Sequence, residues 1–177
     1  MASKIKVDTL ETANGSGTIA LSNQLSGMTS ASMPSGSVLQ VVSATFGTNT
    51  STTSTSFVNT PVALSITPTS TSSKILIMVS TPMYAANANT YAARFTIFRG
   101  TVSGVNLGDS SLGFGNQWSS TGGTSLSVTA SMSFLDSPST TSSQAYTVGI
   151  RSEGNNSAAT IMQSNAKATI TLMEIKG

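Results

Sequence analysis

Residues 125–134 alternate without exception between a hydroxyl-bearing and an apolar side chain. In a β-strand successive side chains point to opposite faces, so this segment would present one apolar face and one ladder of hydroxyl groups. No window of the sequence has a convincing apolar period of 3.6 residues, which a surface helix needs. The chain is therefore expected to be all-β with essentially no helix. The apolar members of the alternation are Leu126, Val128, Ala130, Met132 and Phe134.

Similar patterns recur from residue 38 onward, at about the spacing of an all-β sandwich or barrel. Residues 73–80 are apolar on both faces, which is typical of a central strand covered on both sides. Connections rich in Ser, Thr, Gly and Asn separate the apolar runs. We predict an antiparallel β-sandwich of jelly-roll type, with further strands near residues 38–46, 62–66, 91–99, 146–150 and 168–175.

The composition supplies few groups for catalysis. The chain has no His and no Cys, and only 8% of its residues are charged, against about 25% in an average protein. Imidazole bases, thiol nucleophiles and zinc sites built from nitrogen and sulfur ligands are therefore excluded. No enzyme activity, metal or cofactor is expected. A glycan depolymerase is the least favoured alternative, because it needs paired carboxylates, and the main domain offers only Asp109, Asp136, Glu153 and Glu174.

The charge pattern does not indicate a nucleic-acid or membrane partner. The net charge of +2 is a small difference between eight basic and six acidic residues, and the basic pairs Lys4/Lys6 and Arg94/Arg99 are too small for a nucleic-acid surface. The longest aliphatic run, residues 75–79, is far shorter than the ~20 residues of a membrane-spanning helix. Neither a nucleic-acid partner nor insertion into a membrane is expected.

The first 35 residues differ from the rest of the chain. A small charged cluster is followed by a stretch rich in Gly, Ser, Thr and Asn, and the Pro-Ser-Gly at residues 34–36 predicts a hinge. We therefore predict an extended N-terminal segment over residues 1–35 and a β domain over residues 36–177.

Within this segment, Ile5, Val7 and Leu10 follow a strand-like pattern without a hairpin partner nearby. An isolated strand is marginal in water, so these residues are expected to attach to other copies or to a docking partner by strand addition. A disordered tail is the alternative.

The last predicted strand has two apolar faces. Ile170 and Leu172 point one way, while Met173 and Ile175 point the other way. Either a loop covers the outer face, or that face forms a contact in a homo-oligomer. We favour the oligomer, with Met173, Ile175 and Phe98 in its interface.

The single Trp lies in a short stretch that also carries amides. Trp118 would provide an aromatic platform for a sugar, and Asn116 and Gln117 would donate and accept hydrogen bonds. The alternative is that Trp118 fills the edge of a sheet. These three residues form the ligand site predicted from the sequence.

Four stretches of the chain carry a resemblance to a known family. They are residues 3–12 (SKIKVDTLET), 15–21 (GSGTIAL), 36–42 (GSVLQVV) and 169–175 (TITLMEI). Together they resemble the short virion structural proteins of bacteriophages, especially the fibre and tail-associated proteins of marine and cyanobacterial phages. The resemblance implies a homotrimer on the particle surface, with an N-terminal segment attached to other virion proteins. It also implies a β head similar to the trimeric heads of tumour necrosis factor and complement-type proteins.

Two roles on the virion follow from this resemblance. The first is a trimeric tail fibre or spike component that contacts host glycans through its β head. The second is a capsid decoration protein with a purely structural role. The position on the virion is not encoded in the motifs that carry the resemblance.

Overall fold

The computed structural model describes residue 15 and residues 32–85, 91–119, 125–154 and 158–177. Of residues 91, 92 and 116–119 it describes only the backbone. The chain divides into two compact units, Met1–Ser32 and Met33–Gly177, and every described strand belongs to the second. The predicted attachment residues Ile5, Val7 and Leu10 lie outside the described residues.

The second unit is an antiparallel β-sandwich, which confirms the predicted fold class. Its only helical element among the described residues is a single 3-10 turn, η2 (Gln163–Asn165). The strands are β1 (Val38–Phe46), β2 (Thr50–Thr52), β3 (Val58–Ile66), β4 (Lys74–Ala85), β5 (Tyr91–Arg99), β6 (Val105–Asn106), β7 (Gly115–Ser119), β8 (Leu126–Asp136), β9 (Gln144–Ser152), β10 (Ala159–Ile161) and β11 (Ala168–Ile175).

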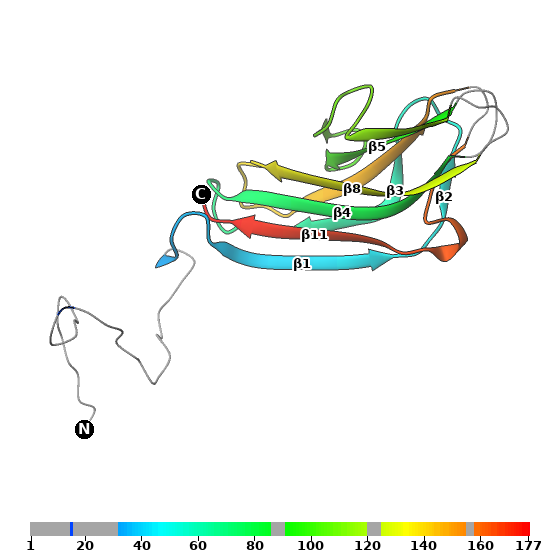
Figure 1. Ribbon diagram of the computed structural model, residues 1–177. Coiled ribbons are helices and arrows are strands. Elements are labelled where there is room, and N and C mark those ends of the chain that lie inside the picture. Colours follow the sequence, from blue (N-terminus) through cyan, green and yellow to red (C-terminus); the bar gives the residue numbers. More distant parts are fainter. Residues whose placement is uncertain (1–14, 16–31, 86–90, 120–124, 155–157) are drawn as a thin grey trace. The chain divides into compact units, whose positions relative to one another are not determined.

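The strands form two sheets. The first has the order β1-β11-β4-β10-β2, with β8 also paired to β4, and the second has the order β3-β9-β5-β6, with β7 also paired to β5. Figure 1 shows β1, β11, β4 and β8 side by side in one layer. The chain passes back and forth between the sheets from β3 to β11, as in a jelly roll.

The inner faces of the two sheets pack into one apolar core. Burying apolar surface at about 25 cal/mol per Å² is the main stabilising contribution to such a fold. In β4, β8 and β11 the core follows the predicted alternation, because inward-facing residues are buried and their neighbours are less so. In β5 and β9 both faces are buried over residues 93–98 and 146–150. In β8 the exception is Val128, which is 42% exposed. Fully buried core residues include Val62, Ile75, Ile77, Ile97, Tyr146, Val148, Ile150, Ile161, Ile170 and Leu172.

Strand β4 is central, as predicted. Ile75, Ile77 and Val79 point into the core, whereas Met78 on the other face is 36% exposed. Among the described residues, therefore, only the inner face of β4 is covered, and the prediction of a cover on both sides is not met within this part of the chain. The outer face of β4 is apolar but has no layer above it among these residues.

A buried ionic cluster joins the two sheets at one end of the sandwich. The Asp136 carboxylate, at the end of β8, accepts a hydrogen bond from Arg99 Nε at 2.8 Å and another from the Tyr146 hydroxyl at 2.8 Å. A second guanidinium nitrogen of Arg99 completes a bidentate pair. Burial and the hydrogen bond to Asp136 raise the pKa of Tyr146, so the phenol stays protonated. The cluster therefore links the last residues of β5 and β8 to the beginning of β9.

A second buried carboxylate lies on β11. Glu174 is fully buried and accepts hydrogen bonds from Gln40 Nε2 at 2.6 Å and from the backbone N–H and hydroxyl of Thr69 at 2.6 and 2.8 Å. Burial acts to raise the pKa of Glu174, but these hydrogen bonds and the nearby Ser73 hydroxyl outweigh it, and the pKa is lowered. The cluster attaches the β3–β4 turn to β1 and β11.

We expect acid to weaken the domain through Glu174. A carboxylate with a lowered folded pKa stabilises the fold fully above its unfolded pKa of about 4.3, and this contribution is lost as the pH falls through the folded pKa. Urea unfolding of wild type and Glu174→Gln at pH 7 and pH 3 measures the effect. The loss between the two pH values should be smaller in Glu174→Gln, whereas equal losses would contradict the assignment.

The residues just before β1 are held to the end of β11. Gly36 N–H donates to the Lys176 carbonyl at 2.8 Å, and Lys176 N–H donates to the Ser37 carbonyl at 2.9 Å. The Lys176 ammonium donates to the Met33 carbonyl. Gly36 has a φ of 86°, which favours glycine at this turn. The domain thus includes Met33–Ser37, although the predicted boundary was after residue 35.

Two truncations test where the domain begins. Removing residues 1–32 should leave the free energy of unfolding of the β domain within about 0.5 kcal/mol of the full chain. Removing residues 1–37 also removes the two backbone hydrogen bonds to Lys176, which should cost about 1–3 kcal/mol. Equal stability of the two truncated chains in urea would show that Met33–Ser37 contribute nothing.

Candidate functional site

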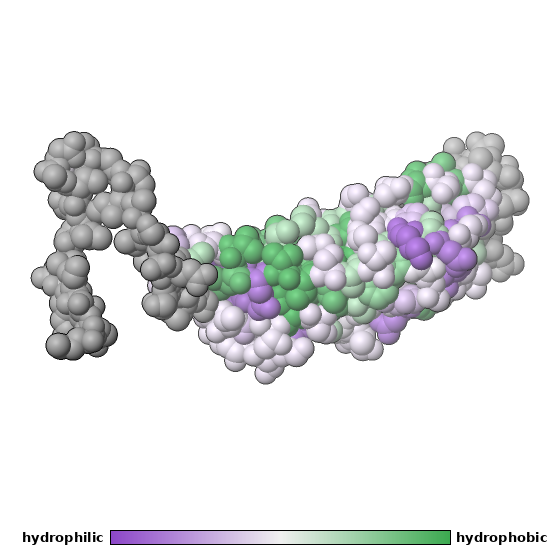
Figure 2. Space-filling model, turned by 90° about the horizontal axis from the view of Figure 1, so that it is seen from below, coloured by the Kyte–Doolittle hydropathy of each residue, from purple (hydrophilic) through white to green (hydrophobic). Residues whose placement is uncertain are grey.

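The outer face of the first sheet carries an apolar row that crosses four strands. The register pairs Val41 of β1 with Met173 of β11, Met173 with Leu76 of β4, and Leu76 with Leu135 of β8. Val41 is 51% exposed and Leu135 is 48% exposed. Together with Met78 on the same face, these residues form what we call the apolar row. Figure 2 views the molecule from the β1 side and shows a larger hydrophobic area toward one end of this side and a smaller one toward the other.

In the next line of register partners along the strands, most side chains carry a hydroxyl group. Ser43, Thr171, Met78 and Ser133 are register partners in the next line across the sheet, and Ser43 and Thr171 share a hydrogen bond of 2.9 Å. Apolar area is therefore concentrated at one end of this face. A contiguous patch of this kind on a sheet face is typical of a surface that contacts another protein.

The three predicted interface residues do not share one surface. Met173 and Ile175 lie half-buried on the outer face of the first sheet, as predicted from the alternation. Phe98 lies on the outer face of the second sheet and is only 4% exposed. Its ring packs against Phe57, with centroids 5.6 Å apart. Phe98 therefore does not belong to the surface that contains Met173 and Ile175, because its own chain covers it.

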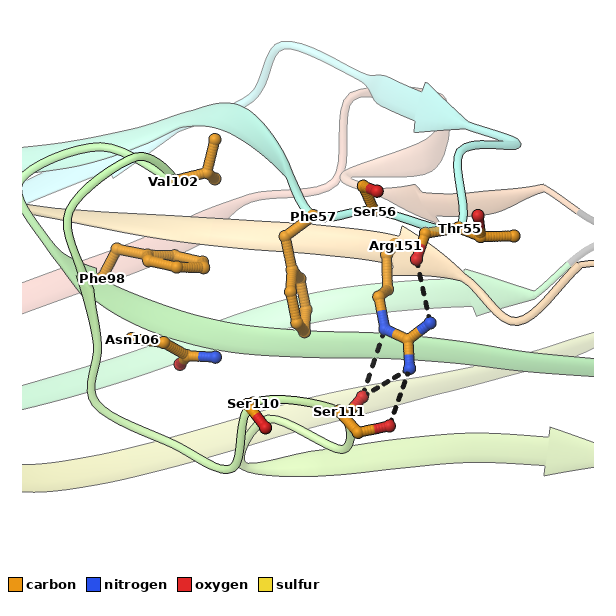
Figure 3. Close-up of a pocket in the computed structure, with 9 residues that line it drawn as sticks. All are labelled: Thr55, Ser56, Phe57, Phe98, Val102, Asn106, Ser110, Ser111 and Arg151. Atoms are coloured by element: carbon orange, nitrogen blue, oxygen red, sulfur yellow. Dashed lines mark hydrogen bonds between the residues drawn. The ribbon is translucent and has the colours of Figure 1, made fainter.

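The second sheet carries a pocket of about 540 Å³ on its outer face, which we call the aromatic pocket. Figure 3 shows the Phe57 ring between Phe98 and the Arg151 guanidinium, with Asn106 and Ser110 on the opposite wall. Phe98 lies flat because residue 149 is glycine, and a Cβ there would be 2.6 Å from the Phe98 ring. The pocket is lined by Thr55, Ser56, Phe57, Phe98, Val102, Asn106, Ser110, Ser111 and Arg151.

Arg151 holds the two sides of the aromatic pocket together. Its Nη1 donates to the Thr55 carbonyl at 2.9 Å, and its Nη2 and Nε donate to the Ser111 carbonyl at 2.6 and 3.1 Å. The guanidinium also lies 5.5 Å from the centre of the Phe57 ring, a cation–π distance. Glu153 lies 3.5 Å from Nη2 and also pairs with Arg94. Arg151 therefore has a structural role, since its guanidinium is engaged in hydrogen bonds to both segments.

The ligand site predicted from the sequence has only its backbone described. Asn116, Gln117 and Trp118 lie in β7, where they pair with Arg94, Ala93 and Ala92 of β5. Their side chains lie outside the described part of the structure, so the prediction of a sugar platform at Trp118 stays a prediction. The aromatic pocket is formed by other residues of the same sheet's outer face.

Sequence reasoning missed the aromatic pocket. Phe57, Asn106 and Arg151 come from three segments that are about 45 residues or more apart, and no motif connects them. The only local signal was Phe57 itself, an aromatic residue at the end of a run of hydroxyl-bearing residues. The pocket exists because the 53–57 and 100–111 segments fold over the same part of β5 and β9.

The carboxylates in the described residues all have structural partners. Asp109 accepts hydrogen bonds from Leu112 N–H and Ser111 N–H, at 2.6 and 2.8 Å, and these lower its pKa. Asp136 and Glu174 belong to the buried clusters, and Glu153 pairs with Arg94. No group of three or more potential metal-ligating side chains occurs within the described ranges. Nor does the described part of the chain contain a helix long and apolar enough to cross a membrane.

Neither a protein-family model nor a curated protein matches this chain. The two surfaces described above are therefore interpreted from their own chemistry.

Proposed function

We propose that the chain is a structural protein of a bacteriophage particle, displayed at the particle surface as a homotrimer, with its β head as a tail fibre or spike component that contacts host glycans. The observation that carries the proposal is the apolar row, since Val41 and Leu135 are about half exposed at its two ends. A second copy of the chain would remove this apolar area from water. The number three comes from the resemblance of the sequence to trimeric phage proteins.

Two further observations support a display role. The β domain is joined to a separate N-terminal unit, Met1–Ser32, which suits a division between attachment by one unit and presentation by the other. The described carboxylates are engaged in structural contacts, which is consistent with a protein that binds rather than catalyses.

The location on the particle tests this function. Antibodies raised against residues 33–177 should label purified phage particles in immunogold electron microscopy, with gold concentrated on tail fibres or spikes. Preimmune serum on the same particles is the control. Gold spread over the capsid would overturn the fibre assignment in favour of a decoration protein. A protein that never sediments with particles would overturn the virion assignment altogether.

The truncated chain gives an independent test of attachment. A chain without residues 1–32 should fold but should not be incorporated into particles, because it lacks the predicted attachment residues. Normal incorporation of this truncated chain would show that attachment lies in the β domain.

A further inference from the structure

We infer that the aromatic pocket is a binding site for a neutral sugar. This inference rests on the proposed contact with host glycans, and it assigns that contact to a place other than Trp118. The volume of about 540 Å³ lies within the range of roughly 300–1,000 Å³ that is usual for small-ligand sites. The pocket is open to solvent on one side, as a site for the end of an oligosaccharide must be.

The apolar wall of the pocket is preorganised. Phe57 is held on one side by the edge of Phe98, at an interplanar angle of 72°, and on the other side by the Arg151 guanidinium. Val102 continues this wall. Phe57 is partly exposed and lines the pocket. Apolar surface that is already fixed can contact the C–H groups of a pyranose without first losing side-chain freedom.

The pocket also offers hydroxyl groups for hydrogen bonds to a ligand. The Thr55, Ser56 and Ser110 hydroxyls line the pocket, and no hydrogen bond of these hydroxyls is found within the described residues. A hydroxyl both donates and accepts, so it suits the hydroxyl groups of a sugar. Asn106 Oδ1 accepts from Gly108 N–H at 3.0 Å, and its Nδ2 donates to the Asp109 carbonyl at 3.1 Å. This leaves one Nδ2 hydrogen for a ligand.

The hydrogen bonding of Arg151 favours a neutral ligand over an anionic one. Among the described residues that line the pocket, Arg151 is the charged one. Its Nε and both terminal nitrogens already donate to the carbonyl groups of Thr55 and Ser111. An acidic sugar or a phosphate would therefore find few free donors on Arg151. A neutral hexose requires neither charge nor metal.

Binding of fluorescently labelled full-length protein to an array of neutral and sialylated oligosaccharides tests the inference. Neutral glycans should bind, and affinities for the best of them can be measured by calorimetry. Phe57→Ala should weaken that binding about 5-fold or more, because it removes apolar contact surface worth about 1 kcal/mol or more from the wall of the pocket. Ser110→Ala, which leaves the aromatic wall intact, should weaken it about 3-fold or more.

Three controls make the outcomes distinct. Leu112→Ala, on an exposed residue outside the pocket, should bind like wild type, and urea unfolding of each variant shows whether it is folded. If Phe57→Ala does not fold, glycan binding by Ser110→Ala alone tests the inference. Glycan binding that survives Phe57→Ala and Ser110→Ala but disappears in Trp118→Ala would overturn the pocket while supporting the proposed function.

The remaining outcomes also separate the two proposals. Binding only to sialylated glycans would overturn the neutral ligand. Absence of binding to any glycan would overturn the pocket and the receptor role together. Pocket-dependent binding by a protein that is absent from particles would support the pocket and overturn the virion function.

Discussion

Asp136→Ala is expected to lower the free energy of unfolding of the β domain by about 3–5 kcal/mol. Asp136 is 3% exposed and accepts hydrogen bonds from both Arg99 and Tyr146. The variant leaves the Tyr146 hydroxyl buried without its acceptor and the Arg99 guanidinium without its counterion. Breaking a buried pair by removing one partner is costly for this reason.

Urea unfolding at a fixed protein concentration measures this loss. Ser127→Ala, on the exposed face of the same strand, is the matched control and should change stability by less than about 0.5 kcal/mol. A loss below about 1 kcal/mol in Asp136→Ala would show that the cluster does not hold the sheets together.

Leu135→Asp is expected to convert the oligomer to monomers at micromolar concentration. In the proposed assembly, each copy would bury a carboxylate at the end of the apolar row. An unpaired charge of this kind typically costs several kcal/mol, which corresponds to at least about a 100-fold loss of affinity. Light scattering coupled to gel filtration measures the mass of each variant.

Leu112→Asp is the matched control for this variant. Leu112 is 49% exposed and Leu135 is 48% exposed, so the two substitutions perturb the isolated domain to a similar degree. Leu112 lies outside the outer face of the first sheet and should keep the wild-type mass. An unchanged mass for Leu135→Asp, or dissociation of both variants, would contradict the proposed interface.

The long strands could be predicted because their burial follows a period of two. Residues 125–134 and 168–175 show this directly, and β8 and β11 lie there. Strands β2, β6, β7 and β10 were missed because two to five residues are too short to show a period. Their positions are set by pairing with longer strands, which is a tertiary effect.

Proline obscured the ends of two strands. Pro61 lies within β3 where the register with β9 shifts. Pro82 lies within β4 where its partner changes from β11 to β10, since Ser80 pairs with Thr169 and Met83 pairs with Ile161. A missing N–H costs little at such a break in the ladder. The sequence shows the prolines but not the breaks that accommodate them.

The candidate sites differ in how far sequence could identify them. The apolar outer face was visible in the alternation of Met173 and Ile175, since strand periodicity assigns side chains to faces. Phe98 follows the same rule but is covered by Phe57, which arrives from a distant connection. The aromatic pocket likewise depends on connections from distant parts of the sequence that fold over the second sheet. Local patterns carry no information about which loops meet.

The mass of the full-length protein in solution is the most direct test of the proposed self-association. Light scattering coupled to gel filtration at micromolar concentration should give about three times the chain mass of 18.0 kDa. A single species of 18.0 kDa would contradict the proposed assembly, because the apolar row would then remain exposed without a partner copy.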